Sequence, residues 1–197
     1  MSSAPARSSR DPVRLALDTA VAAVIGAVRA QAVLNPVILI DGCSGSGKST
    51  LARATVAAWP LHGRVQLVAL DSLYPGWDGL ADGVETARAQ VLHPHARGTI
   101  GVWQRWDWAA GEYAEAHAVD PALPLIVEGS GILTARTAPL SDIRVWLESP
   151  ERSRRARALA RDGDTYRPHW ERWAAQERAH MQQDAPERLA TLRFTVP

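Results

Sequence analysis

Apolar residues follow two patterns that alternate along the chain. Residues 13–33 place them at the three- and four-residue spacing of an amphipathic helix, which begins at Asp11-Pro12 and stops at Asn35-Pro36. Four short runs are almost wholly apolar, as strands buried on both faces of a parallel sheet are, and they span 37–41, 65–70, 123–127 and 143–147. The alternation of such strands with helices predicts an α/β fold.

The other segments carry the remaining predicted elements. Helices are expected from residue 48 to Pro60, over 81–92 with an end at His93-Pro94, over 151–162 and over 169–183, and a last strand over 192–196. Residues 1–12 are predicted to be a disordered tail. No repeat or linker divides 13–197, and a chain of 197 residues with 46% hydrophobic content is enough for one core, so we expect a single domain.

A glycine-rich turn separates the first predicted strand from the helix that follows it. Gly42 to Ser49 matches G-x-x-x-x-G-K-[ST] in full. In this pattern the backbone N–H groups and the helix N-terminus face phosphate oxygens, the lysine reaches the β and γ phosphates, and the serine hydroxyl binds Mg²⁺. A chance glycine turn is disfavoured by the strand before it and the helix after it. The predicted nucleotide-binding residues are Gly42, Ser44, Gly45, Ser46, Gly47, Lys48, Ser49 and Thr50.

Composition strengthens this prediction. The chain has 21 arginines and a single lysine, Lys48. Most of the arginine content is explained by codon bias in a GC-rich genome. Retention of one lysine in the loop is consistent with a need for a compact ammonium group, which arginine cannot supply.

Charge and cysteine content limit the partners that we expect. The net charge of +1 provides no general attraction to nucleic acid or membrane, and no apolar run reaches the roughly 18 residues of a membrane span. Cys43 is the only cysteine, which excludes internal disulfides and suits a reducing cytoplasm. The expected partners are therefore a nucleotide and a small-molecule acceptor, with self-association left open.

Two carboxylates follow predicted strands. Asp71 stands at the end of the 65–70 run and Glu128 directly after the 123–127 run. Ligands bind at this edge of open α/β sheets, where Asp71 can orient or deprotonate a hydroxyl acceptor and Glu128 can hold the water shell of Mg²⁺. An aspartate that only caps a turn is the alternative for Asp71. The predicted metal ligands are Ser49, Asp71 and Glu128.

Tryptophans gather in the segment 101–108. Trp103, Trp106 and Trp108 alternate with polar residues and are predicted to lie on one face of a strand. They form either a core cluster or a stacking wall for a planar acceptor beside Arg105 and Asp107, and both interpretations stay open.

The segment 151–162 is rich in arginine. A helix there places Arg154, Arg157 and Arg161 near one face, and Gly163 follows as a hinge. A solvated surface is the usual explanation for such a run. Because phosphoryl transfer depends on charge neutralisation, we favour a helical lid over about residues 150–168.

Several motifs occur in the order found in one enzyme family. GCSGSGKST, Asp71-Ser72-Leu73-Tyr74, Trp106-Asp107-Trp108, Val127-Glu128-Gly129 and the arginine run resemble the uridine kinase and related nucleoside kinase family of P-loop proteins. The resemblance implies a three-layer P-loop kinase fold with a mostly parallel central sheet and a small helical lid, and it implies ATP and Mg²⁺ as cofactors. It implies Lys48, Asp71, Arg157 and Arg161 as catalytic residues, and Tyr74, Asp78, Arg105, Trp106 and Asp107 as substrate-binding residues.

The resemblance is weaker at the acceptor. The family has a base-contacting histidine three residues after the Trp106-Asp107-Trp108 position, and here that residue is Gly111. The sequence therefore predicts a kinase with a nucleoside as the first candidate acceptor. A nucleotide or other small-metabolite kinase, and a regulatory ATPase or switch without such an acceptor, are the alternatives. The GTPase motif N-K-x-D is excluded, because Lys48 is the only lysine.

Overall fold

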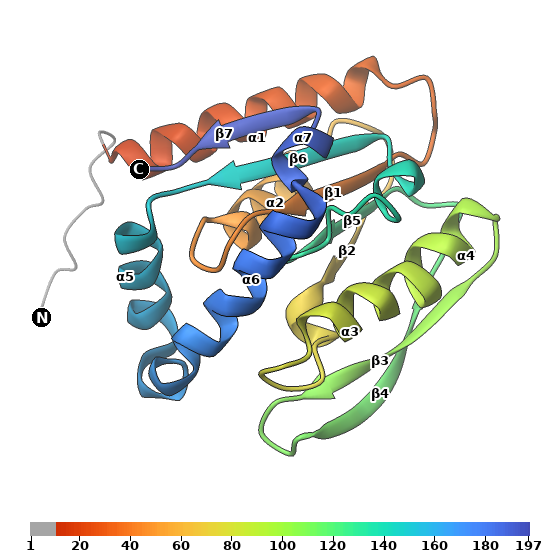
Figure 1. Ribbon diagram of the computed structural model, residues 1–197. Helices are drawn as coiled ribbons and strands as arrows, with labels where there is room; N and C mark the ends of the chain where they lie inside the picture. Colours follow the sequence, from red (N-terminus) through yellow and green to blue (C-terminus); the bar gives the residue numbers. More distant parts are fainter. Residues whose placement is uncertain (1–10) are drawn as a thin grey trace, which may run out of the picture.

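The computed structural model describes residues 11–197. Five parallel strands form its central sheet in the order β2-β5-β1-β6-β7 (Figure 1). They are β1 (Val37–Asp41), β2 (Gln66–Ala69), β5 (Leu125–Glu128), β6 (Ile143–Glu148) and β7 (Leu192–Thr195). The predicted α/β fold with a parallel central sheet is confirmed. The predicted tail, residues 1–12, lies outside the described residues except for Asp11 and Pro12, which cap and begin the first helix.

Helices cover both faces of the sheet. They are α1 (Pro12–Ala30), α2 (Lys48–Ala57), α3 (Leu80–Thr86), α4 (His93–Ala96), α5 (Glu151–Asp162), α6 (Trp170–Asp184) and α7 (Pro186–Leu189). Side chains of β1 alternate between two buried clusters: Ile38 and Ile40 pack with α1 and α2, whereas Leu39 packs with α3 and α6. This alternation follows from the two-residue period of a strand and produces three layers, with α1 and α6 on opposite sides of the sheet (Figure 1).

A separate antiparallel hairpin joins β3 (Gly101–Asp107) to β4 (Glu112–Val119). The sequence did not predict β4, because its residues are mostly exposed and alternate between alanine and polar side chains, which is a weak strand pattern. The hairpin lies beside α3 and α4, outside the central sheet (Figure 1). It brings Trp106 to the same side of the molecule as the carboxyl ends of the parallel strands.

Some predicted boundaries were wrong. The first helix ends at Ala30 instead of residue 33. The helix after Gly79 does not end at His93-Pro94 but continues through a π-helical turn, Ala87–Leu92, into α4. Pro94 stands in the first turn of α4, directly after the π-helical turn, where the regular hydrogen-bond pattern of the helix is already interrupted.

The end of β2 also differs from the prediction. The strand stops at Ala69, and Leu70–Ser72 forms a short 3₁₀ turn that carries Asp71. Further 3₁₀ turns span Ala138–Leu140, Gly163–Thr165 and Arg167–His169. In residues 11–197 no helix is both long and apolar enough to cross a bilayer.

Candidate active site

The glycine-rich loop, here called the P-loop, connects β1 to α2. Gly42 and Gly45 adopt positive φ angles of 149° and 78°. A Cβ atom at Gly42 would lie 2.4 Å from the carbonyl oxygen of Leu147, and one at Gly45 would lie 2.2 Å from that of Arg154. Only glycine fits at both positions, because the loop is packed tightly between β6 and α5.

Lys48 begins α2 and is largely buried. Its Nζ atom donates hydrogen bonds to the Cys43 carbonyl oxygen and to Ser130 Oγ, each at 3.2 Å. Thus both ends of the P-loop and the turn after β5 meet at this ammonium group.

One cavity of about 760 Å³ lies beside the P-loop. It brings together residues that the sequence singled out as site candidates: Ser44, Gly45, Gly47, Lys48, Ser49, Thr50, Asp71, Tyr74, Arg105, Trp106, Glu128, Arg157 and Arg161. Their segments lie far apart in the sequence and converge at the carboxyl edge of the sheet, where ligands bind in open α/β folds.

Four candidates do not line this cavity. Gly42 and Ser46 are buried within the P-loop, and the Ser46 hydroxyl has no hydrogen-bond partner. Asp78 forms an exposed ion pair with Arg172, whose hydrogen bond lowers the pKa of the Asp78 carboxyl.

Asp107 is the fourth, and it stabilises the hairpin turn. Its Oδ1 atom accepts hydrogen bonds from the Ala109 and Ala110 amides, which lower its pKa, and its Oδ2 atom pairs with Arg105. Asp78 and Asp107 were both predicted to bind substrate. In the structure the Asp78 carboxylate forms a surface ion pair, and the Asp107 carboxylate stabilises the hairpin turn.

Two carboxylates stand close together in the cavity. Burial raises the pKa of the Glu128 carboxyl, the charge of Lys48 opposes that rise, and the neighbouring Asp71 adds to it. Asp71 is exposed on its 3₁₀ turn, and its backbone oxygen accepts a hydrogen bond of 2.7 Å from Trp108 Nε1. The hairpin is thereby attached to the turn that carries Asp71.

The residues present fit Mg²⁺ bound together with a nucleotide. Within residues 11–197, no group of three or more His, Cys, Asp or Glu side chains could hold a metal ion. Mg²⁺ commonly takes one or two carboxylates and completes its shell with water and substrate phosphates. Glu128, Asp71 and the Ser49 hydroxyl supply oxygen atoms of this kind beside the P-loop.

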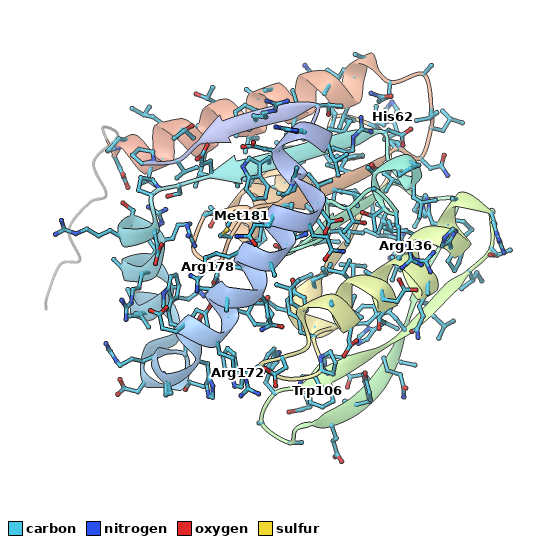
Figure 2. All side chains as sticks on the ribbon, in the orientation of Figure 1. His62, Trp106, Arg136, Arg172, Arg178 and Met181 are labelled. Atoms are coloured by element: carbon cyan, nitrogen blue, oxygen red, sulfur yellow. The ribbon has the colours of Figure 1, made fainter. Side chains whose placement is uncertain are left out.

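Aromatic side chains line the other end of the cavity. They are Trp77, Trp106 and Trp108, whereas the cavity residues Tyr74, Tyr166 and Trp173 lie on the P-loop side, next to Ser130, Ser44 and Glu177 respectively. Trp77 is at the centre, with ring centroids 4.8 Å from Trp108 and 5.3 Å from Tyr166. Figure 2 shows Trp106 on the hairpin that closes this side.

The predicted common face of three tryptophans was wrong for Trp103. This side chain is buried in the core and stacks on His117 at 4.7 Å. The register of β3 and β4 shifts between Gln104 and Trp106, so positions on either side of the irregularity no longer share a face. The core interpretation therefore holds for Trp103, whereas Trp106 and Trp108 line the cavity.

Two arginines of α5 donate hydrogen bonds to backbone carbonyl groups of the P-loop. Arg154, which is buried, donates to the carbonyl oxygens of Ser149 and Ser44 at 3.1 Å each. Arg157 donates to the Gly45 carbonyl oxygen at 2.8 Å and also to the Ser149 hydroxyl. These contacts fix the first half of α5 against the loop.

Arg161 is held differently. It pairs with its neighbour Asp162 at 2.7 Å, is half exposed and lines the cavity. Gly163 follows with a φ angle of 60°. In the predicted lid segment, 150–168, the arginines before Arg161 are bonded to P-loop carbonyl oxygens, whereas the part from Arg161 onward contacts the P-loop through Tyr166, beside the Ser44 side chain.

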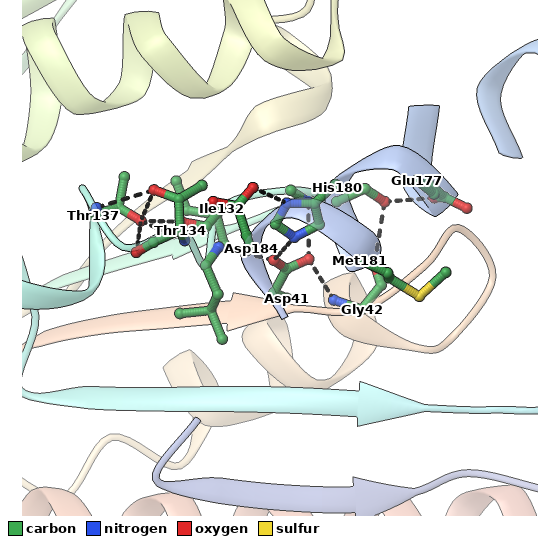
Figure 3. A network of polar contacts seen from close by, with 12 residues as sticks. Asp41, Gly42, Ile132, Thr134, Thr137, Glu177, His180, Met181 and Asp184 are labelled. Carbon is green, nitrogen blue, oxygen red and sulfur yellow. Dashed lines mark hydrogen bonds and ion pairs between the residues drawn. The ribbon is translucent and has the colours of Figure 1, made fainter. Parts of the chain in front are cut away.

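Sequence reasoning missed several residues of the site. Trp77 and Trp173, and the cavity residues Arg53 and Ser130, lie outside the motifs that the sequence displays. On α6, Glu177 and His180 are buried behind the cavity, and Figure 3 shows His180 between Asp41 and Asp184. Only the amphipathic pattern of 169–183 signalled this helix, and it did not reveal that polar side chains face inward.

The strand order and the P-loop after β1 give the chain the fold of P-loop kinases. No protein-family model matches the sequence, and no curated protein is similar to it at the sequence level. Among solved structures, a candidate uridine kinase from Bacillus stearothermophilus is similar with a TM-score of 0.66 and 18% identity, over 92% of this chain and 98% of that one.

A second solved structure is similar over most of its length. It is a candidate fructose transport system kinase from Silicibacter sp. TM1040, with a TM-score of 0.52 and 20% identity over 88% of this chain and 98% of that one. Identities this low show a common fold, so the acceptor has to be inferred from the site.

Proposed function

We propose that this protein is an ATP- and Mg²⁺-dependent kinase that transfers the γ-phosphoryl group to a hydroxyl group of a small molecule, with a nucleoside as the first candidate. A single observation carries the proposal: one cavity joins Lys48 and Ser49 of the P-loop to Asp71 and then to the aromatic end. A phosphate donor and a planar acceptor can thus occupy the same cavity with a carboxylate between them.

Each residue has a definite task in this reaction. The P-loop amides and Lys48 bind the phosphates, and Ser49 and Glu128 would hold Mg²⁺, which when bound neutralises charge on the β and γ phosphates. Asp71 orients the acceptor hydroxyl and accepts its proton as the oxygen attacks phosphorus. Arg161 offers its guanidinium to the transferred group from the lid segment.

The aromatic end favours an uncharged, planar acceptor. Arg105 lines it but is already paired with Glu115 at 2.7 Å and with Asp107 at 3.2 Å. Its charge is balanced, so it offers little to an acceptor phosphate, whereas the indoles of Trp106 and Trp108 offer stacking surfaces. This favours a nucleoside or another ring-bearing alcohol over a nucleotide.

The solved neighbours support a hydroxyl acceptor. Their names refer to uridine and fructose, which are both alcohols. We therefore propose an acceptor among small hydroxylated molecules and rank a nucleoside above a sugar, because the cavity wall is aromatic.

The direct test measures transfer of labelled phosphate from γ-labelled ATP with Mg²⁺ to nucleosides, nucleoside monophosphates and small hydroxylated metabolites. Lys48→Ala serves as the blank. We expect a labelled nucleoside or related alcohol with wild type only. No labelled product from any member of the panel, with ATP still bound, would contradict transfer to these classes of acceptor.

A second test examines the nucleotide site alone. An ATP acyl-phosphate probe should acylate Lys48, which is the only lysine. Excess unlabelled ATP should protect it. Labelling that ATP does not reduce would contradict nucleotide binding at the P-loop.

A further inference from the structure

Glu177 of α6 is a buried carboxylate that touches the P-loop. It is only 3% exposed, although a charged side chain is rarely buried unless it is paired. Its Oε1 atom accepts a hydrogen bond of 2.5 Å from the Ser44 amide and one of 2.8 Å from Ser130 Oγ. Trp173 Nε1 donates a third at 3.1 Å.

The polar groups that contact this carboxylate are three hydrogen-bond donors and one guanidinium group. Its Oε2 atom lies 3.8 Å from Arg154 Nη1, which itself binds the Ser44 carbonyl oxygen. Both backbone polar groups of Ser44 are thus hydrogen-bonded: its N–H donates to Glu177 of α6, and its C=O accepts from Arg154 of α5. A glutamine at 177 could keep one oxygen on the three donors, but these hydrogen bonds would lose the carboxylate charge and its NH₂ group would face the Arg154 guanidinium.

A chain of hydrogen bonds leads from Glu177 to Lys48. The Ser130 hydroxyl has one proton, and its shortest contact is with Glu177, at 2.8 Å against 3.2 Å to the Gly42 carbonyl oxygen. When that proton points to Glu177, the lone pairs of Ser130 Oγ face the ammonium group of Lys48 at 3.2 Å. Glu177 therefore orients the hydroxyl that holds the lysine.

We propose that Glu177, acting through Ser130 and the Ser44 amide, is a positioning residue that sets the P-loop and Lys48 for phosphate binding. The role assigned to Lys48 rests on the proposed function. The placement of Glu177 behind the loop, with Ser130 between it and the cavity, lets it act without touching the nucleotide.

The sign of the effect on nucleotide affinity distinguishes positioning from simple charge. Removal of a negative charge near a polyanion should tighten ATP binding if Glu177 acts only through its field. A positioning role predicts the opposite. For Glu177→Gln we expect Mg-ATP to bind about tenfold more weakly, because hydrogen bonds to a neutral amide oxygen hold the Ser44 amide and the Ser130 hydroxyl less strongly than those to a carboxylate.

The experiment compares four proteins by calorimetric titration with Mg-ATP: wild type, Glu177→Gln, Ser130→Ala and Glu171→Gln. Glu171 is the matched control, because it lies on the same helix with its side chain 69% exposed. Both Glu177→Gln and Ser130→Ala should weaken binding, and Glu171→Gln should not. Wild-type or tighter affinity in either of the first two would overturn the proposal.

A second readout needs no nucleotide. In the free protein, trinitrobenzenesulfonate should modify Lys48 about tenfold faster in both variants, since the ammonium group loses the partner that holds it; peptide mass spectrometry separates Lys48 from the α-amine. An unchanged rate would contradict the proposal. If Glu177→Gln does not fold, Ser130→Ala decides alone.

These readouts separate the two proposals. A wild type that binds no Mg-ATP contradicts the proposed function, while the modification rate still tests the link between Glu177 and Lys48. A wild type that binds and transfers phosphate, with variants that behave like it, rejects the positioning role only.

Discussion

The two ends of the cavity are built in different ways. At the phosphate end, one continuous segment of backbone curls between β1 and α2, and buried side chains brace it from α5 and α6. At the aromatic end, single side chains converge from the loop that carries Trp77 and from the β3–β4 hairpin.

The two ends therefore differ in the amino-acid substitutions that they can tolerate. A backbone site depends on φ angles and close packing, so it accepts few changes and binds a chemical group that many molecules share. A side-chain site can be altered one residue at a time. We therefore expect damage at the phosphate end to abolish the reaction and damage at the aromatic end to change the choice of acceptor.

The largest effect should come from Lys48→Ala. Loss of the ammonium group should reduce phosphate transfer by roughly 1000-fold or more, because the developing charge loses its main fixed cation. Lys48→Arg should be almost as inactive, since the guanidinium group is too large for the space between Cys43 and Ser130. Full activity in Lys48→Ala would show that the P-loop is not the site.

Asp71→Asn should rank second. Transfer should fall by about 100-fold, as expected for loss of a general base, while the Kd for ATP changes little. Asp78→Asn is the matched control, because Asp78 lies in the same loop but is paired with Arg172 outside the cavity. Equal loss of binding and transfer in Asp71→Asn would make Asp71 a structural residue.

Trp108→Phe should have a smaller and more selective effect. It removes the hydrogen bond to the Asp71 backbone and part of the stacking surface, so the KM for the acceptor should rise roughly tenfold with little change in the KM for ATP. Trp103→Phe, in the core, should lower the thermal midpoint and leave both KM values near wild type. A rise in the KM for ATP alone would contradict the assignment of Trp108 to the acceptor end of the cavity.

The smallest effect concerns His180. Burial lowers its pKa, but the hydrogen bond and charge of Asp41, reinforced by Asp184, outweigh burial and leave the pKa above its ordinary value of 6.5. A raised pKa stabilises the folded protein fully below about pH 6.5, and this contribution disappears as pH rises through the folded-state pKa.

Chemical denaturation of wild type and His180→Gln at pH 6 and pH 8.5 checks this expectation. The difference in the free energy of unfolding should be larger at pH 6. A difference that grows toward pH 8.5 would mean that Asp41 and Asp184 do not hold a proton on the imidazole.

The contrast between the two ends also explains how far the sequence could be interpreted. The parallel strands and the P-loop were predictable because their patterns are contiguous: apolar runs, and glycines at fixed spacing before Lys48. The cavity edge formed by Asp71 and Glu128 followed from the rule that parallel strands share a carboxyl edge.

The remaining features depend on contacts between distant segments. Glu177 binds Ser44 from 133 residues away, and no local pattern marks a buried glutamate on an amphipathic helix. The shift in register between Gln104 and Trp106 separated Trp103 from the other tryptophans, and only the pairing with β4 reveals it. Asp78 was predicted to bind substrate, but its partner is Arg172 of α6, 94 residues away in the sequence.

The presence of one lysine makes the phosphate end its own spectroscopic reporter. Protein produced with isotopically labelled lysine would contain a single labelled side chain, at the P-loop. Its magnetic resonance spectrum would thus need no assignment among lysines. Addition of each candidate ligand in turn would show directly which ones change the resonances of the Lys48 side chain and which leave them unchanged.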